Sequence, residues 1–232
     1  MPAEEQETSR RPVNARRLAS IHRAAGWLAN MGVSPNTVSV ASLVFAIAAG
    51  ALLFYTGQIE PGSFIERAAL IAASAFVALR LLANLLDGLI AIEGGKKSPL
   101  GGVFNELPDR LSDALILIGF GYAAGGNPTL GFVAALVAIT IAYIRELGHG
   151  LGARHHFLGP MAKQQRMALV IAAGIWIALT PAGWRPESHG LWLGIPAAVT
   201  IIIIALGIVT TCRRLQRIAH DLRRLDRGED PA

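Results

Sequence analysis

Long apolar stretches recur along the whole 232-residue chain, and they constrain its fold more than any other feature of the sequence. A helix needs about 20 mostly apolar residues to cross a bilayer, and six stretches approach that length. The stretches are continuous and rich in Ala and Leu, whereas a transmembrane barrel would show short segments of alternating polarity. We therefore expect an all-α integral membrane protein with six transmembrane helices. The predicted spans are residues 37–56, 68–92, 107–124, 128–147, 167–182 and 191–212.

Charge also favours a membrane location. Charged residues make up 16% of the chain, below the roughly 25% of ordinary soluble domains. The net charge of +5 could suggest a nucleic-acid partner, but lysines and arginines gathered in cytoplasmic loops account for it, so we expect none. Sixteen of the 21 lysines and arginines lie on one side of the predicted spans. They are Arg10, Arg11, Arg16, Arg17, Arg23, Lys96, Lys97, Arg154, Lys163, Arg166, Arg213, Arg214, Arg217, Arg223, Arg224 and Arg227.

This asymmetry predicts a bacterial-type inner-membrane protein with both termini in the cytoplasm. We divide the chain into a cytoplasmic N-terminal segment (1–36), a six-helix catalytic domain (37–212) and a basic cytoplasmic tail (213–232). Both flanking segments carry an apolar stripe on a basic background, which predicts a helix on the membrane surface or, equally, a solvated juxtamembrane helix. The stripes are formed by Leu18, Ile21, Trp27 and Leu28, and by Leu215, Ile218, Leu222 and Leu225.

Ionisable residues gather at one end of the second and third predicted spans. Such residues are costly inside a membrane and are functional candidates. Asp87 shares a helix face with Asn84, and Asp109 shares one with Asp113, because these pairs are three and four residues apart. A short Gly-rich connection predicts that the two spans are antiparallel neighbours. Three carboxylates should then converge near the cytoplasmic surface, with few cations nearby to neutralise them.

Converging carboxylates repel one another unless they bind a cation. Oxygen ligands select hard ions such as Mg²⁺, which commonly shares its coordination with the phosphates of a substrate. The cluster therefore predicts a metal-dependent enzyme that acts on a phosphate-containing substrate. Gly88, directly after Asp87, leaves room for a ligand near the backbone, although Gly in a membrane helix is more often a packing contact.

At these residues the sequence resembles the CDP-alcohol phosphatidyltransferases. Asn84-Leu-Leu-Asp87-Gly88-Leu-Ile-Ala91, followed by Asp109-x-x-x-Asp113, is similar to the family signature D-x-x-D-G-x-x-A-R…G-x-x-x-D-x-x-x-D. Upstream, Gly32-Val-Ser-Pro-Asn-Thr-Val-Ser is similar to the segment that commonly precedes the first span in the family. Its Ser and Pro residues also suit a helix start. The resemblance covers nearly the whole chain.

The resemblance implies transfer of a phosphatidyl group from CDP-diacylglycerol to a hydroxyl of a small alcohol, with release of CMP, Mg²⁺ or Mn²⁺ as cofactor, and a homodimer. It implies that Asp87 and Asp109 bind metal together with Asn84, and that Asp113 binds metal or acts as the base. The CDP-lipid would be bound at Asn84, Gly88, Ala91 and Arg80.

Three residues depart from the signature: Asn84 replaces an Asp, Ile92 an Arg and Asn105 a Gly. An Asn oxygen can still bind a metal, but one negative charge is lost. Glu106 is a candidate to restore that carboxylate. The phosphate contact of the missing Arg could come from Arg80, or from Lys96 and Lys97 in the following loop.

Further polar residues lie at the inner end of the fourth predicted span and in the loop after it. Four of them could bind an acceptor that carries its own phosphate, or could be ordinary positive charge of a cytoplasmic loop. They are Arg145, Arg154, Lys163 and Arg166. The spacing of His149, His155 and His156 does not match a zinc motif, so we interpret them as loop histidines.

Two other functions remain open at the level of sequence. A relative with a degenerate site could act as a non-catalytic partner of another membrane protein. A transporter could use buried carboxylates to pass ions, but its ionisable residues would be spread across the depth of the bilayer, whereas here they gather at one side.

Overall fold

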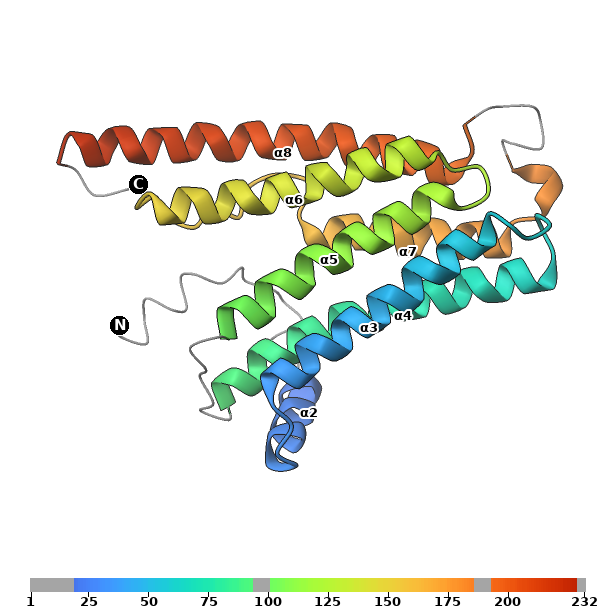
Figure 1. Cartoon of the computed structure of the whole chain (residues 1–232), viewed down its shortest axis with the longest axis horizontal. Coiled ribbons are helices and arrows are strands. Elements are labelled where there is room, and N and C mark those ends of the chain that lie inside the picture. The colour runs from blue at the N-terminus through green and yellow to red at the C-terminus, as the bar shows by residue number, and fades with distance from the viewer. Residues whose placement is uncertain (1–18, 94–100, 186–192, 229–232) are drawn as a thin grey trace.

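We describe a computed structural model of the protein, in which residues 19–93, 101–185 and 193–228 are placed (Figure 1). These residues form helices and connecting loops, and no strand occurs among them. The helices are α2 (Ala19–Asn30), α3 (Pro35–Thr56), α4 (Phe64–Glu93), α5 (Gly101–Tyr122), α6 (Pro128–Gly150), α7 (Lys163–Leu179), the short 3₁₀ helix η2 (Ala182–Trp184) and α8 (Ile195–Asp226).

The six long helices, α3 to α8, correspond to the six predicted spans. Four of them, α3, α4, α6 and α8, are long and apolar enough to cross a membrane. Helix α5 carries several charged residues in its first half, and α7 has only 17 residues, so length and composition alone do not identify these two as spans. The protein is therefore an integral membrane protein that is all-helical over its described residues, and the structure supports four of the six predicted spans.

Local sequence explains where α3 and α6 begin. Ser34 precedes α3, and its hydroxyl accepts a hydrogen bond from the backbone N–H of Thr37 at 3.1 Å. Asn127 caps α6 in the same way, through the N–H of Leu130. In both helices a Pro stands in the first turn, where no N–H donor is needed. The predicted helix start at Ser34 is thus confirmed.

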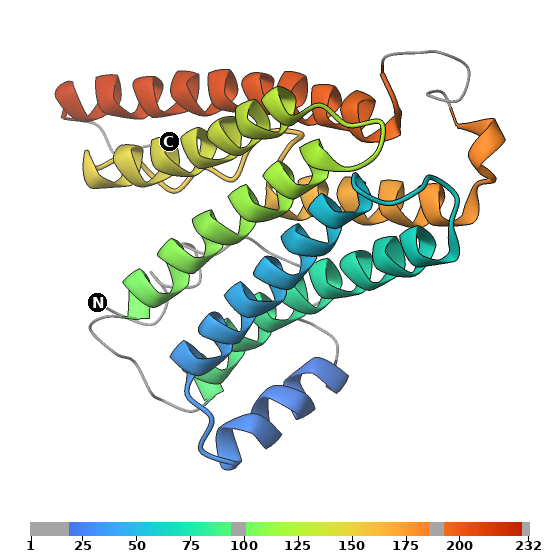
Figure 2. The same ribbon diagram turned by 45° about the vertical axis from the view of Figure 1, so that its right-hand side comes forward.

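Helices α3 and α4 pack together, and so do α6 and α8 (Figures 1 and 2). Helices α5 and α7 each contact both pairs. Helix α3 packs along both α4 and α5, α4 also packs on α7, and α6 packs between α5 and α8. Helices α4 and α5 are antiparallel, as predicted, but they are not close neighbours along their length. Their side chains meet near the end where the aspartates lie, because Arg80 and Asn84 of α4 donate hydrogen bonds to Asp109 of α5.

Small residues allow α3 and α5 to approach closely. A side chain at Gly50 of α3 would place its Cβ 2.7 Å from the carbonyl oxygen of Leu115 in α5. Small residues at such contacts are typical of helix packing in membranes. Around this contact a continuous apolar core includes Ala46 and Leu53 from α3 and Phe120 from α5. The last turns of α4 and the first turns of α5, which carry the polar residues, lie outside this core.

Both terminal segments differ in part from the prediction. Helix α2 crosses the end of α4, and Ile21 and Leu28 pack there around buried Ala25, while Trp27 is exposed (Figure 2). Helix α8 shows no break after residue 212 and continues to Asp226 as one helix. The predicted second surface helix is thus an extension of α8, because its apolar residues Ile218 and Leu222 pack near α6. Leu18 lies outside the described residues.

A buried ion pair links α4 to η2 at the opposite end of the molecule from the aspartates. Arg185 Nη1 donates to Glu66 Oε1 at 2.8 Å, and Nη2 donates to the carbonyl oxygen of Ile177 at 2.9 Å. Each side chain of the pair is 1% exposed. Both charges are therefore removed from water.

We expect Arg185→Leu to lower the free energy of unfolding by about 3–5 kcal/mol, because it leaves the Glu66 carboxylate buried without its guanidinium partner. Thermal unfolding of the purified protein in detergent measures this change. The double variant Arg185→Leu/Glu66→Leu removes both charges and should be more stable than the single variant. An Arg185→Leu protein as stable as the wild type would contradict the assignment.

Candidate active site

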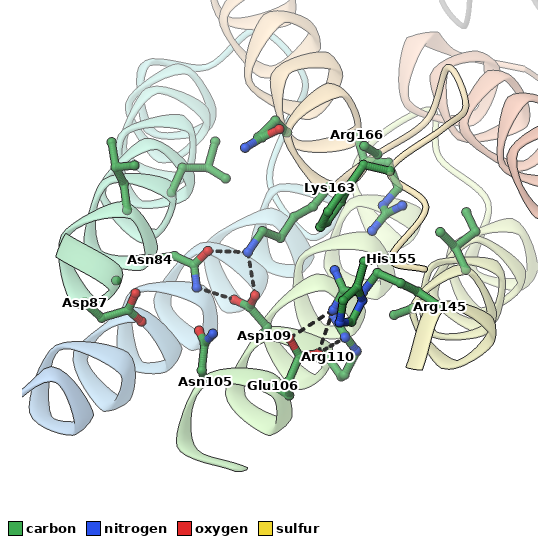
Figure 3. A pocket seen from close by; sticks show the side chains of 18 of the residues that line it. Asn84, Asp87, Asn105, Glu106, Asp109, Arg110, Arg145, His155, Lys163 and Arg166 are labelled. Atoms are coloured by element: carbon green, nitrogen blue, oxygen red, sulfur yellow. Dashed lines mark hydrogen bonds and ion pairs between the residues drawn. The ribbon is translucent and has the colours of Figure 1, made fainter. Parts of the chain in front are cut away.

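A cavity of about 600 Å³ opens where α4, α5, α6 and α7 converge (Figure 3). It is lined by Asn84, Asp87 and Asp109 and also by the cations Arg145, Lys163 and Arg166. Its other polar lining residues are Asn105, Glu106, Arg110, Glu146, His155, Gln164 and Arg214. The cavity thus brings predicted carboxylates and predicted phosphate-binding cations to one place.

Asp109 contacts three nitrogen donors. Its Oδ1 accepts hydrogen bonds from Asn84 Nδ2 at 2.7 Å and from Arg80 Nη2 at 3.1 Å. Its Oδ2 accepts one from Lys163 Nζ at 2.5 Å. Lys163 also donates to the Asn84 side-chain oxygen, so these three side chains point toward one another (Figure 3). Asp109 is therefore neutralised by cations of the chain itself.

Asp113, one turn further along α5, is bound by two arginines. Arg80 Nη2 donates to its Oδ1 at 2.9 Å, and Arg166 Nη2 donates to its Oδ2 at 2.6 Å. Arg166 also holds the carbonyl oxygen of Met161 at 2.9 Å. Asp113 is buried and is not among the residues that line the cavity. Its carboxylate is therefore linked to the cavity through Arg166 and, by way of Arg80, through Asp109.

Asp87 differs from the other two aspartates. It lines the cavity, and Ser39 Oγ donates to its Oδ2 at 2.7 Å. Among the residues that the structure describes, no lysine or arginine forms an ion pair with Asp87. Asp87 is thus the aspartate at the cavity whose charge remains available to an incoming cation.

The expectation of few cations near the carboxylates is wrong. Arg80 is fully buried on α4, and Lys163 and Arg166 reach the aspartates from the start of α7. The sequence could not show the α7 contacts, because Lys163 and Asp109 are 54 residues apart. Buried carboxylates at this density require such partners.

Ser39 is a site residue that the sequence did not identify as one. It lies on α3, and its hydroxyl joins Asp87 to the carbonyl oxygen of Pro35 at 3.2 Å. It is also the last residue of the upstream segment that resembles the family. That segment was the signal that could have revealed its position near the signature.

At the mouth of the cavity, Glu106 is bound by arginines. Arg145 Nη2 donates to both Glu106 oxygens at 3.0 and 3.1 Å, and Arg110 forms a second ion pair with Glu106. Arg145 also pairs with Glu146 at 2.6 Å and lies over the ring of Phe157. Glu106 therefore faces α6 and does not take the place of the carboxylate missing at Asn84.

The remaining predicted residues lie at different distances from the cavity. Gly88 lines it, but Ala91 and Arg154 do not. The Arg154 backbone N–H donates to buried Asp221 on α8. Lys96 and Lys97 lie outside the described residues, as does the side chain of Ile92.

The three histidines do not form a metal site. The rings of His149 and His155 stack 3.9 Å apart, and burial lowers the pKa of His155, with His149 acting in the same direction. His156 Nε2 instead contacts Asp221 at 2.7 Å. Across the described ranges, no three His, Cys, Asp or Glu side chains form a group that could hold a metal ion. The prediction of loop histidines is wrong for His149, which lies in the last turn of α6, whereas His155 and His156 lie in the loop that follows.

The cavity nevertheless suits a hard divalent ion whose coordination is completed by substrate phosphates. Asp87, Asp109 and Asn84 line it and offer oxygen atoms. Mg²⁺ commonly uses one or two carboxylates and takes further oxygens from substrate phosphates. Lys163 contacts two of the three residues, so an ion could use Asp109 and Asn84 fully only if Lys163 moved.

The sequence profile of the CDP-alcohol phosphatidyltransferases matches residues 32–213 of this chain. The chain belongs to the CDP-alcohol phosphatidyltransferase family. The matched region runs from the loop before α3 into α8, so it contains every residue that lines the cavity except Ile21 and Arg214. The family that the signature resembled is thus confirmed.

Several known proteins are similar to this chain along most of their length. The inner membrane protein YnbA of Escherichia coli strain K12 is 25% identical over 196 residues, which are 84% of this chain and 90% of that protein. The archaetidylinositol phosphate synthase of Aeropyrum pernix is 29% identical over 200 residues, covering 86% and 90% of the two chains.

Solved structures of a phosphatidylinositol phosphate synthase show the same fold. The phosphatidylinositol phosphate synthase of Mycobacterium tuberculosis with CDP-DAG bound superposes with a TM-score of 0.67 at 19% identity, covering 85% of this chain and 92% of that one. Its complex with manganese and citrate gives a TM-score of 0.67 at 20% identity, covering 85% and 88%. At these identities the likeness concerns the fold alone.

Proposed function

We propose that this protein transfers a phosphatidyl group from a CDP-linked lipid, CDP-diacylglycerol, to a hydroxyl of a small alcohol, and releases CMP. The observation that carries the proposal is a cavity lined both by the carboxylates Asp87 and Asp109 and by the cations Lys163, Arg145 and Arg166. The carboxylates suit a metal ion, and the cations suit phosphates. Family membership supplies the reaction class.

In the proposed reaction, the acceptor hydroxyl oxygen forms a bond to the phosphorus attached to the diacylglycerol. The bond between that phosphorus and the bridging oxygen of the pyrophosphate breaks, and CMP leaves with the bonding electrons. The hydroxyl proton goes to a carboxylate, which must lie within hydrogen-bonding reach. The family resemblance implied Asp113 as the base or as a metal ligand, but Asp87 lines the cavity and Asp113 does not. We therefore propose Asp87 as the proton acceptor and Asp113 as a residue that positions Arg166.

We propose Mg²⁺ or Mn²⁺ as the cofactor, held by Asp87 together with substrate phosphate; Asp109 and Asn84 could add ligands only if Lys163 moved away from them. A divalent ion offsets the charge of a pyrophosphate and of a leaving phosphate. The manganese complex of the Mycobacterium tuberculosis synthase supports this choice. Gly88 leaves room for the CDP-lipid beside Asp87. Arg80 was predicted to contact the same lipid, but its guanidinium is turned to Asp109 and Asp113.

The acceptor is proposed to carry a phosphate of its own. Lys163, Arg166 and Arg145 line the cavity and can donate hydrogen bonds to phosphate oxygens. Relatives named as inositol phosphate lipid synthases support an acceptor of this class. Arg154 lies outside the cavity, so its role in acceptor binding stays a prediction from sequence.

We also propose that α5 and α7 cross the membrane, which gives six spans. Both lie within the same bundle as the four apolar helices, and buried Ile116, Phe120 and Val170 from these helices belong to its core. The excess of basic residues near the site supports a cytoplasmic location for the site and both termini. The homodimer implied by the family resemblance stays a prediction.

CMP release tests the reaction directly. Purified protein in detergent is incubated with CDP-diacylglycerol, Mn²⁺ or Mg²⁺ and a mixture of alcohol acceptors, and CMP is quantified by chromatography. We expect CMP only when the divalent ion and an acceptor are both present. CMP release that persists with a chelator would contradict the proposed role of the metal.

A second candidate function is a non-catalytic family member that binds CDP-lipid. Asn84 and the ion pairs of Asp109 and Asp113 favour it, because they occupy oxygens that a metal would use. Metal-dependent thermal stabilisation by CDP-diacylglycerol without CMP release would support this alternative over the enzyme.

Ser39→Ala should lower kcat for CMP release by about 10–100-fold, the usual effect of losing a residue that orients a metal ligand. The variant removes the hydroxyl that holds Asp87. Ser39→Thr keeps a hydroxyl and should retain most activity. Equal rates for Ser39→Ala and wild type, at equal thermal stability, would show that Ser39 does not position Asp87.

A further inference from the structure

Asn84, Asp109 and Lys163 form a closed ring of polar contacts in the cavity wall (Figure 3). Asn84 Nδ2 donates to Asp109 Oδ1 at 2.7 Å, and Lys163 Nζ donates to Asp109 Oδ2 at 2.5 Å. Lys163 also donates to the Asn84 oxygen. Each of the three side chains therefore contacts the other two.

The ring requires an amide at position 84. An amide has both a donor and an acceptor, so Asn84 can bind a carboxylate through one atom and an ammonium through the other. An Asp at this position has no N–H, and its charge would lie at hydrogen-bonding distance from Asp109. Two carboxylates at that range repel each other or share a cation. Asn84 thus removes a negative charge at the point where Lys163 supplies a positive one.

The fold holds Lys163 in this position. It is the first residue of α7, and the start of that helix is fixed on both sides of it. The Ala162 N–H donates to Gln165 Oε1 at 2.8 Å, and Arg166 Nη1 donates to the Met161 carbonyl oxygen at 2.9 Å. The Lys163 side chain is 24% exposed, so it remains in contact with the cavity.

We propose that the Lys163 ammonium is a built-in cation that takes the place of a divalent ion between positions 84 and 109. The site then takes one divalent ion fewer than a site with carboxylates at both positions. The ion that still binds is held by Asp87 and by substrate phosphate. This inference rests on the proposed function, but its test counts metal ions and does not require turnover.

The experiment is a Mn²⁺ titration of the purified full chain in detergent, with free Mn²⁺ followed by electron paramagnetic resonance. The decisive variant is Asn84→Asp/Lys163→Met, which restores the carboxylate and removes the ammonium. We expect it to bind one more Mn²⁺ per chain than the wild type. Lys163→Met alone removes the competing cation and should tighten Mn²⁺ binding by at least about tenfold, by analogy with the effect of residues around metal ligands.

Arg217→Met is the matched control, because it removes one positive charge from an exposed position of α8 that does not line this cavity. It should bind Mn²⁺ like the wild type. Equal stoichiometry in the wild type and the double variant would overturn the proposal. If the double variant does not fold, the Mn²⁺ affinity of Lys163→Met tests the proposal instead. An affinity equal to that of the wild type would overturn the proposal.

The outcome separates this inference from the proposed function. A wild type that binds no Mn²⁺, beside a double variant that does, supports the role of Lys163 and contradicts metal dependence of the native reaction. If the wild type releases CMP but the double variant binds no additional Mn²⁺, the proposed reaction stands and the proposed role of Lys163 is wrong.

Discussion

Asp87→Asn is expected to lower kcat/KM for CMP release by at least about 100-fold, since residues that only orient a metal ligand already contribute 10–100-fold. Asp87 lines the cavity and is held by a neutral hydroxyl, so its charge can serve an incoming divalent ion. Asn keeps the shape of the side chain and one oxygen but removes the charge and the ability to accept the acceptor's proton. CMP release from CDP-diacylglycerol in the presence of Mn²⁺ measures the effect.

Asp226→Asn is a matched control, because it makes the same substitution at the exposed end of α8. It should leave the rate unchanged. Thermal unfolding of both variants establishes that they are folded. If Asp87→Asn retained more than about a tenth of the wild-type kcat/KM, Asp87 would contribute less than about 1.4 kcal/mol to the transition state and could not have the proposed role.

Asp113→Ala should remove both activity and stability. Its carboxylate binds Arg80 and Arg166, and losing one partner of a buried ion pair typically costs about 3–5 kcal/mol. Arg166 would also lose its orientation at the cavity, which should abolish CMP release. The free energy of unfolding and the CMP rate are measured on the same preparation.

A double-mutant cycle separates this explanation from a general packing defect. If Asp113 acts through Arg166, then Asp113→Ala and Arg166→Leu together should cost less than the sum of the two single changes. Ser112→Ala is the neighbouring control, because the Ser112 hydroxyl is buried and has no hydrogen-bond partner among the described residues. It should change stability little. Full activity of Asp113→Ala would contradict any role of Asp113 in the reaction.

Sequence was sufficient to predict the helices because lipid imposes a simple requirement on them. Each spanning segment must be long, apolar and internally hydrogen-bonded, so α3, α4, α6 and α8 are visible as continuous runs. Helix α5 is less apolar because it carries the site residues. The length of α8 was not predictable from hydropathy, because its polar last turns are held by packing of Ile218 near α6.

The site was predictable only where its residues are close in sequence. The three- and four-residue spacings of Asp87 with Asn84 and of Asp109 with Asp113 identified the carboxylates. The contacts of Lys163 and Arg166 depend on how α7 packs against α4, which no local spacing records. These contacts change the chemistry of the site, because the carboxylates that were expected to be unpaired form a network of ion pairs.

The central claim is that this site joins a CDP-lipid to an alcohol, and lipid product analysis tests it most directly. Purified protein in detergent is given CDP-diacylglycerol and Mn²⁺ with glycerol 3-phosphate, inositol phosphate, inositol or serine in separate reactions, and lipids are identified by mass spectrometry. The account predicts a new phospholipid with one of the phosphorylated acceptors, in an amount equal to the CMP released, and none with Asp87→Asn. Absence of any lipid product with every acceptor, from folded protein that still binds CDP-diacylglycerol, would contradict it.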